Sequence, residues 1–142
     1  MNIYDCFMYF DEDMLLDLRL NILNKYVKKF IITESTYLHS GNKKKLNFDI
    51  QNFSQFKDKI EYIVVDEPPK GIEQIKDEDG IEVKNKKILD NSLKRENNQR
   101  NMQAEGLKNA SDNDLVLLSD LDEIPNLVNF KYKDKITLFI QN

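Results

Sequence analysis

Short apolar segments that each end in polar residues constrain the fold of this 142-residue chain more than any other feature. We interpret four of them as β-strands, at residues 3–10, 30–33, 62–65 and 115–118. Strands that are apolar throughout and alternate with helices are typical of a parallel sheet that is covered on both faces. The sequence therefore predicts an α/β fold with a mostly parallel sheet flanked by helices.

Helical periodicity supports the same fold class. Between residues 14 and 27 the apolar side chains recur at helical spacing; they are Leu15, Leu18, Ile22 and Tyr26, with Leu16, Leu20, Leu23 and Val27 widening the stripe. A second helix is expected over about residues 90–110, and a last strand over residues 136–140.

The remaining organisation is that of one domain over residues 1–142. Between residues 70 and 88 charged residues dominate, which indicates a mobile loop or insertion rather than a domain boundary. The chain stops just after the last expected strand, so we expect the sheet to be truncated at its C-terminal end. An incomplete sheet exposes an edge or a face, which predicts self-association.

Composition excludes several classes of protein. The formal net charge is −4 and the sequence pI is about 5.1, whereas nucleic-acid-binding domains are usually strongly basic. No segment approaches the roughly 18 apolar residues of a membrane span, and no secretory signal is visible, so the expected location is the cytoplasm. The single cysteine, Cys6, excludes an internal disulfide framework and lies in an apolar strand, where we expect a small core residue.

Acidic residues follow the predicted strands at the ends where ligands bind in parallel sheets. Asp120 and Asp122 come directly after the strand at residues 115–118, and in extended backbone residues i and i+2 point the same way. Two carboxylates suit a divalent cation whose other ligands are phosphate oxygens and water. The alternative is an acidic turn that caps the next segment.

Arg100 is the second candidate, because it lies on a helix face that we expect to pack inward. That face holds Leu93, Asn97, Arg100, Ala104 and Leu107. A buried guanidinium needs a partner, and Asp120, Asp122 or a ligand diphosphate would each serve. The alternative is a structural Arg–Asp pair with no role in binding. Arg95 and Gln99 project elsewhere on an ideal helix.

Glu34 is the third candidate, at the end of the second predicted strand. Its carboxylate can accept hydrogen bonds from a base or a ribose hydroxyl, or it can cap a turn together with Ser35 and Thr36. His39, the only histidine, lies in a polar loop and is expected to be solvated.

Four motifs, in order along the chain, resemble glycosyltransferase family 17, the family of β-1,4-mannosyl-glycoprotein β-1,4-N-acetylglucosaminyltransferase. They are residues 4–10 with Asp11 and Glu12, residues 33–36 with Gly41, residues 95–96 with residues 99–101, and residues 119–125. The resemblance implies a GT-A fold and a nucleotide-sugar donor, with UDP-N-acetylglucosamine expected. It further implies a glycan acceptor and transfer with inversion at the anomeric carbon.

The resemblance also implies roles for individual residues. Asp120 and Asp122 would hold Mn²⁺ or Mg²⁺ against the donor diphosphate. Arg100, with Arg95 and Gln99, would steady the phosphates, and Glu34 would lie where the uridine binds.

Members of the family continue beyond the length of this chain, so the acceptor site and the catalytic base are expected outside it. We do not expect the base to be Glu123. The alternative function is a truncated, non-catalytic module of the same fold that binds a nucleotide sugar or a partner chain. A phosphatase with Asp120 as nucleophile fits poorly, because no threonine follows Asp122 at the usual spacing.

Overall fold

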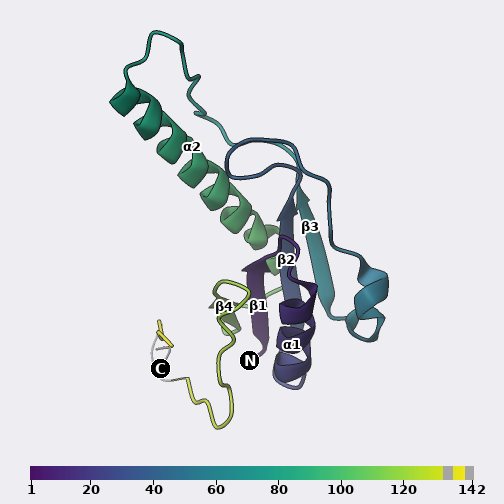
Figure 1. The fold of residues 1–142 in the computed structure, drawn as a ribbon. Coiled ribbons are helices and arrows are strands. Elements are labelled where there is room, and N and C mark those ends of the chain that lie inside the picture. Colours follow the sequence, from purple (N-terminus) through teal and green to yellow (C-terminus); the bar gives the residue numbers. More distant parts are fainter. Residues whose placement is uncertain (133–135, 140–142) are drawn as a thin grey trace.

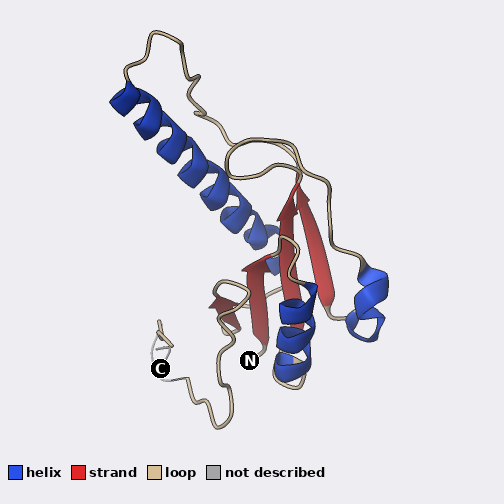
Figure 2. Cartoon of the chain, viewed as in Figure 1, coloured by secondary structure: helices blue, strands red, loops and turns tan. Residues whose placement is uncertain are grey.

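The computed structural model describes residues 1–132 and 136–139 and contains one four-stranded sheet (Figures 1 and 2). The strands are β1 (Ile3–Met8), β2 (Lys29–Ser35), β3 (Ile60–Val65) and β4 (Leu115–Leu118). Their order is β3-β2-β1-β4, and every neighbouring pair is parallel. This confirms the predicted α/β fold with a parallel sheet.

Helical segments cover both faces of this sheet. They are α1 (Asp13–Leu23), the 3₁₀ segment η1 (Ile50–Phe56), α2 (Ile81–Asn101) and the 3₁₀ segment η2 (Met102–Leu107). Of these, α1 and η1 pack on one face, whereas η2 packs on the other. Most of α2 extends away from the sheet and reaches it only at its C-terminal end (Figure 1). None of the helices in the described part of the chain is long and apolar enough to cross a membrane.

The main core lies between the sheet and α1. Side chains that alternate along the strands meet the buried face of the helix; they are Phe7, Phe30, Ile32 and Leu117 from the sheet and Leu16, Leu20 and Leu23 from α1. A smaller cluster on the opposite face joins Tyr4, Cys6 and Ile31 to η2. Cys6 is thus a core residue as expected, and burial raises the pKa of its thiol to about 12.

Gly106 allows η2 to approach the sheet closely. A Cβ atom at this position would lie 2.7 Å from Cγ2 of Ile31, which is closer than packed carbon atoms come. A glycine is therefore required where the second layer of the fold crosses β2.

The buried side of α1 differs from the predicted stripe. Leu18 and Ile22 are largely exposed, and the core is made by Leu16, Leu20 and Leu23. Arg19 lies among these leucines and is completely buried. The buried stripe is therefore the side of the predicted one that holds Leu16, Leu20, Leu23 and Val27, and it includes Arg19, whose partner Asp5 lies in the sheet.

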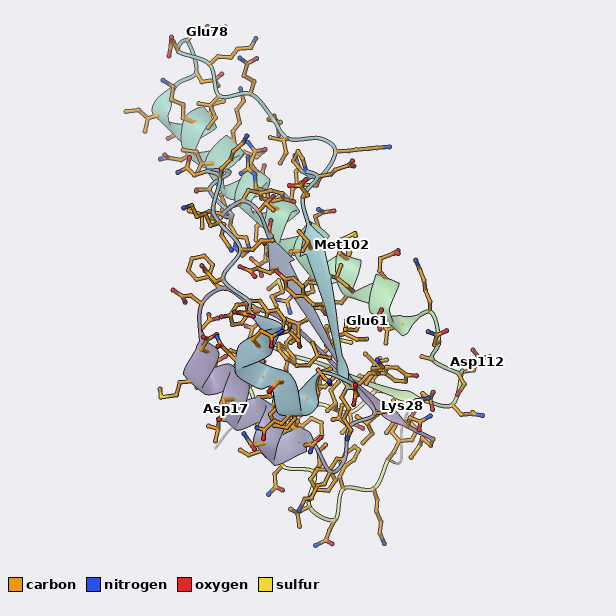
Figure 3. All side chains as sticks on the ribbon, turned by 90° about the vertical axis from the view of Figure 1, so that its right-hand side faces the viewer. Asp17, Lys28, Glu61, Glu78, Met102 and Asp112 are labelled. Carbon is orange, nitrogen blue, oxygen red and sulfur yellow. The ribbon has the colours of Figure 1, made fainter. Side chains whose placement is uncertain are left out.

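The predicted bounds of the second helix, about residues 90–110, are wrong at both ends, because α2 spans Ile81–Asn101 and continues only as the 3₁₀ segment Met102–Leu107. Residues 81–87, expected in the charged loop, are helical, because lysine and glutamate are good helix formers and this part of α2 is solvated. Side chains that end in nitrogen or oxygen atoms project from the first turns of α2 (Figure 3). Glu78, labelled in the same view, lies in the loop that precedes the helix. That loop folds back on the helix: Asp79 pairs with Lys87 at 2.6 Å, and the side chain of Asn91 bonds to the backbone of Glu73.

The expected inward face of this helix is also wrong. Leu93, Asn97 and Ala104 are exposed, and of the predicted face only Leu107 packs against a core cluster. The buried residues are Asn91 and Gln99 in α2 and Gln103 and Gly106 in η2. Only the last turn of α2 contacts the sheet, so a long apolar stripe has nothing to pack against (Figure 1).

The β4 edge is less covered than the apolar sequence predicts. Leu117 is buried on the α1 side, but Val116 and Leu118, on the other face, are 46% and 58% exposed. A hollow of about 450 Å³ lies between β4, residues 123–126 and residues 137–139. The expected last strand is wrong for residues 136–139, which form no regular structure, and Ile140 lies outside the described residues.

Leu20→Ala should lower the free energy of unfolding by about 2–5 kcal/mol, because it leaves a cavity in the main core. Leu18→Ala, on the exposed side of the same helix, should cost less than about 1 kcal/mol. Urea denaturation of both variants measures the difference. Equal losses would contradict the observed orientation of α1.

Asp114 should make stability fall at acid pH. Hydrogen bonds from the backbone amides of Ser111 and Asn2 lower the pKa of this carboxyl from 3.8 to about 2. A carboxyl with a lowered pKa stabilises the fold above its unfolded pKa, and this contribution is lost as the pH falls from 3.8 to about 2.

Asp114→Asn should therefore destabilise the protein at neutral pH, and the gap to the wild type should close over that acid range. Urea denaturation of both proteins at a series of pH values measures it. A gap that is constant with pH would show that the ionised carboxylate contributes nothing.

Candidate functional site

A cavity of about 580 Å³ opens at the carboxyl ends of β1, β2 and β4. Its wall is formed by Met8, Tyr9, Phe10, Glu12, Leu15, Tyr37, Leu38, His39, Lys44, Glu96, Gln99, Asp120, Leu121 and Asp122. Cavities of this size hold small-molecule ligands, and this edge of a parallel sheet is where such ligands bind. The structure thus brings Asp120, Asp122 and Gln99 together at one cavity.

The loop after β4 is a tight turn and not the extended backbone expected from the sequence, and both Asp120 and Asp122 line the cavity. The backbone N–H of Glu123 donates to the carbonyl of Asp120, and that of Ile124 donates to the carbonyl of Asp122, both at 3.1 Å. The Glu123 side chain accepts from the backbone N–H of Asp120 at 3.1 Å. Glu123 therefore holds the turn together.

Arg100 pairs with one of these two carboxylates. Its Nη2 lies 3.2 Å from Oδ1 of Asp120 and 3.3 Å from Oε1 of Glu96. Asp120 is one of the two protein partners that the sequence allowed. The arginine is only partly buried, at 29% side-chain exposure, so some of its N–H donors remain accessible to a ligand.

Two further predicted residues on α2, Gln99 and Arg95, bond to the backbone next to the cavity. Gln99 is buried and donates from Nε2 to the carbonyl of Thr33 at 3.0 Å. Arg95 is not part of the cavity wall; it donates to the carbonyl of His39 at 2.9 Å. The Arg95 guanidinium lies against Gly41, whose φ of +95° and contact space suit glycine alone. Arg95 thus holds the loop that contributes Leu38 and His39 to the wall.

Glu34 is completely buried and is bonded to protein groups only. Its carboxylate accepts from Nζ of Lys44, the backbone N–H groups of Asn47 and Phe48, and the hydroxyl of Tyr62. Burial and this bond to Glu34 raise the pKa of Tyr62, so its hydroxyl remains a donor. Glu34 therefore ties residues 44–48 to the end of β2.

Asp5 and Arg19 form a buried ion pair that the sequence analysis missed. Nη2 and Nε of Arg19 donate to the two oxygens of Asp5 at 2.7 and 2.9 Å, and both side chains are 0% exposed. Burial raises the pKa of the Asp5 carboxyl, and the Arg19 guanidinium opposes that shift. An arginine within an apolar helical stripe and an aspartate within an apolar strand were the signals that could have revealed the pair.

The carboxylates of the site suit a cation whose other ligands come from water and from a bound substrate. The described residues contain no group of three or more histidine, cysteine, aspartate or glutamate side chains placed to hold a metal. Asp120 and Asp122 supply two hard carboxylate ligands. Across residues 1–132 and 136–139, the Asp122 carboxylate makes no hydrogen bond or ion pair, and one Asp120 oxygen is shared with Arg100.

Glu34→Gln should lower the free energy of unfolding by about 3 kcal/mol, because it leaves the half-buried Lys44 ammonium without its counter-charge. Urea denaturation measures the loss. Glu67→Gln, at an exposed glutamate, is the control and should change little. A loss for Glu34→Gln no larger than that of the control would show that Glu34 is dispensable for this loop.

The amino-acid sequence matches the family model of glycosyltransferase family 17 over residues 1–135. The match covers nearly the whole chain and includes the strand ends and the loop that form the cavity. No curated protein and no solved structure matches the chain. The chain belongs to glycosyltransferase family 17 and is a glycosyltransferase.

Proposed function

We propose that this glycosyltransferase binds a nucleotide-sugar donor in the cavity, with its diphosphate beside Asp120, Asp122 and Arg100. The carrying observation is that Asp120 and Asp122 line the cavity at the carboxyl ends of parallel strands, and that the partly accessible guanidinium of Arg100, which is not itself part of the wall, pairs with Asp120. A divalent cation and a guanidinium are the groups that best bind a diphosphate. The parallel sheet supports a GT-A arrangement of this donor site.

The residues fit Mn²⁺ or Mg²⁺ as the cation. Asp122 offers both carboxylate oxygens, and Asp120 offers the oxygen that Arg100 does not contact. The remaining positions fall to phosphate oxygens and water, as these hard cations prefer. When bound, the cation would supply positive charge against the leaving nucleoside diphosphate.

Further residues in and beside the cavity would bind and orient the donor. Arg100 orients Asp120 and directs its free N–H groups towards a phosphate. The apolar side chains of Phe10 and Leu38 suit a nucleobase. Because the Glu34 carboxylate is used by the protein, Glu34 would act on the uridine through residues 44–48. UDP-N-acetylglucosamine is the proposed donor, on the family resemblance.

Transfer with inversion to a glycan acceptor needs a carboxylate that takes the proton of the attacking hydroxyl. The glutamates at the cavity are already engaged: Glu12 accepts from the backbone of Phe10 and Asp11, and Glu96 pairs with Arg100. Glu123 bonds to the backbone of Asp120. We therefore propose none of them as the base. The same observation favours a second candidate function, a module that binds the nucleotide sugar without transferring it.

Calorimetric titration with UDP-N-acetylglucosamine, with and without Mn²⁺, tests the donor site. The wild type should bind only with the metal, and Asp120→Asn/Asp122→Asn should weaken binding by about 100-fold, or about 2.8 kcal/mol. The control is Asp17→Asn/Asp112→Asn, which removes two exposed aspartates that do not line the cavity; both are labelled in Figure 3.

Absence of heat from folded protein would contradict the donor proposal, and metal-independent binding would contradict the cation. Transfer of the sugar to a glycan, followed by release of the nucleoside diphosphate, separates the enzyme from the binding module.

A further inference from the structure

The Asp5–Arg19 ion pair lies directly beneath the loop that carries Asp120 and Asp122. Besides its two bonds to Asp5, the Arg19 guanidinium donates from Nη1 to the carbonyls of Asp120, Leu121 and Glu123, at 2.7, 3.0 and 3.2 Å. Its Nη2 also donates to Oγ of Ser119 at 2.8 Å. The buried side chain of Arg19 is thus bonded to residues from Ser119 to Glu123, from one end of this turn to the other.

All five N–H donors of Arg19 are used in this arrangement. Asp5 fixes the guanidinium from the sheet side, and the ring of Phe7 lies 4.6 Å from its central carbon. The loop carbonyls converge on the guanidinium from the other side, while the side chains of Asp120 and Asp122 line the cavity. The direction of the two carboxylates is therefore linked to the position of Arg19.

We propose that Asp5 and Arg19 are positioning residues for the donor site: they hold the loop so that Asp120 and Asp122 point at one cation. This inference rests on the proposed function and deepens it. Neither residue touches the donor, and both act through the backbone of residues 119–123. Lysine cannot replace Arg19 here, because an ammonium group has three donors and no planar fork.

Stability alone does not account for the pair. Taking two charges out of water is costly, and apolar residues of similar volume often stabilise a fold as well as a buried ion pair does. Replacement of both partners therefore separates a positioning role from a structural one. Asp5→Leu/Arg19→Met removes both charges and leaves neither charged partner without its counter-charge, but it also removes every bond from Arg19 to the loop, including the bond to the buried carbonyl of Leu121.

The test measures three properties of the wild type, Asp5→Leu/Arg19→Met and Arg19→Lys. Urea denaturation reports the fold, hydrogen exchange of the Glu123 and Ile124 amides reports the loop without any ligand, and electron paramagnetic resonance reports Mn²⁺ affinity with UDP present. Lys59→Met is the matched control, because Lys59 also binds two backbone carbonyls, but these belong to Asn24 and Val27 and not to the loop at residues 119–123.

We expect both variants to fold, to lose exchange protection at the two amides, and to bind Mn²⁺ about 10- to 100-fold more weakly, the range for groups that orient metal ligands. The control should retain wild-type affinity. If Asp5→Leu/Arg19→Met does not fold, Arg19→Lys alone decides.

Wild-type Mn²⁺ affinity in a folded Arg19 variant would overturn the inference, as would unchanged exchange at the two amides. Absence of Mn²⁺ binding by the wild type would instead overturn the proposed function and, with it, the metal-positioning role. In that case the exchange measurement, which needs no ligand, still shows whether Arg19 holds the loop.

Discussion

The burial of a single guanidinium links three parts of this protein that are distant in the sequence. Arg19 on α1 joins Asp5 in the central part of the sheet to the loop that follows β4. A charge buried to this extent is stable only when all of its donors are satisfied, so the helix, the strand and the loop must adopt one relative arrangement. The side of α1 that carries Arg19 accordingly faces the sheet together with Leu20, and Leu18 lies on the exposed side.

Parallel strand pairing then determines where the chemistry lies. Because β1, β2 and β4 run in the same direction, the residues that follow them meet at one edge of the sheet. Separate contacts hold the walls of the cavity there: Glu34 fixes residues 44–48, and Arg95 fixes the loop that contains His39. The loops that form the binding site are thus fixed in place by side chains that belong to a strand, β2, and a helix, α2.

The sequence predicted the four strands, the parallel arrangement and the two aspartates at the cavity, because a fully apolar run followed by acidic residues is a local signal. It did not predict the start of α2 or its buried face. Lysine and glutamate at residues 82–87 fit a solvated helix as well as a loop, and the periodicity of α2 gave no sign that only its last turn meets the sheet. Burial of Gln99 depends on contacts made far from it in the chain.

The sequence by itself determined the fold class and the place of the acidic motif after β4. The reason is that the length and apolar character of a strand, and the order of the strands along the chain, depend on residues that are neighbours in the sequence. Only the tertiary structure decided the partners of the charged side chains. The sequence marks Glu34 as a candidate and places Asp5 and Arg19 within apolar segments, but it does not say which groups they bind; their roles arise from burial and from pairing with Lys44 and with each other. The physical reason is that the cost of burying a charge, and therefore its need for a partner, exists only once the chain has packed.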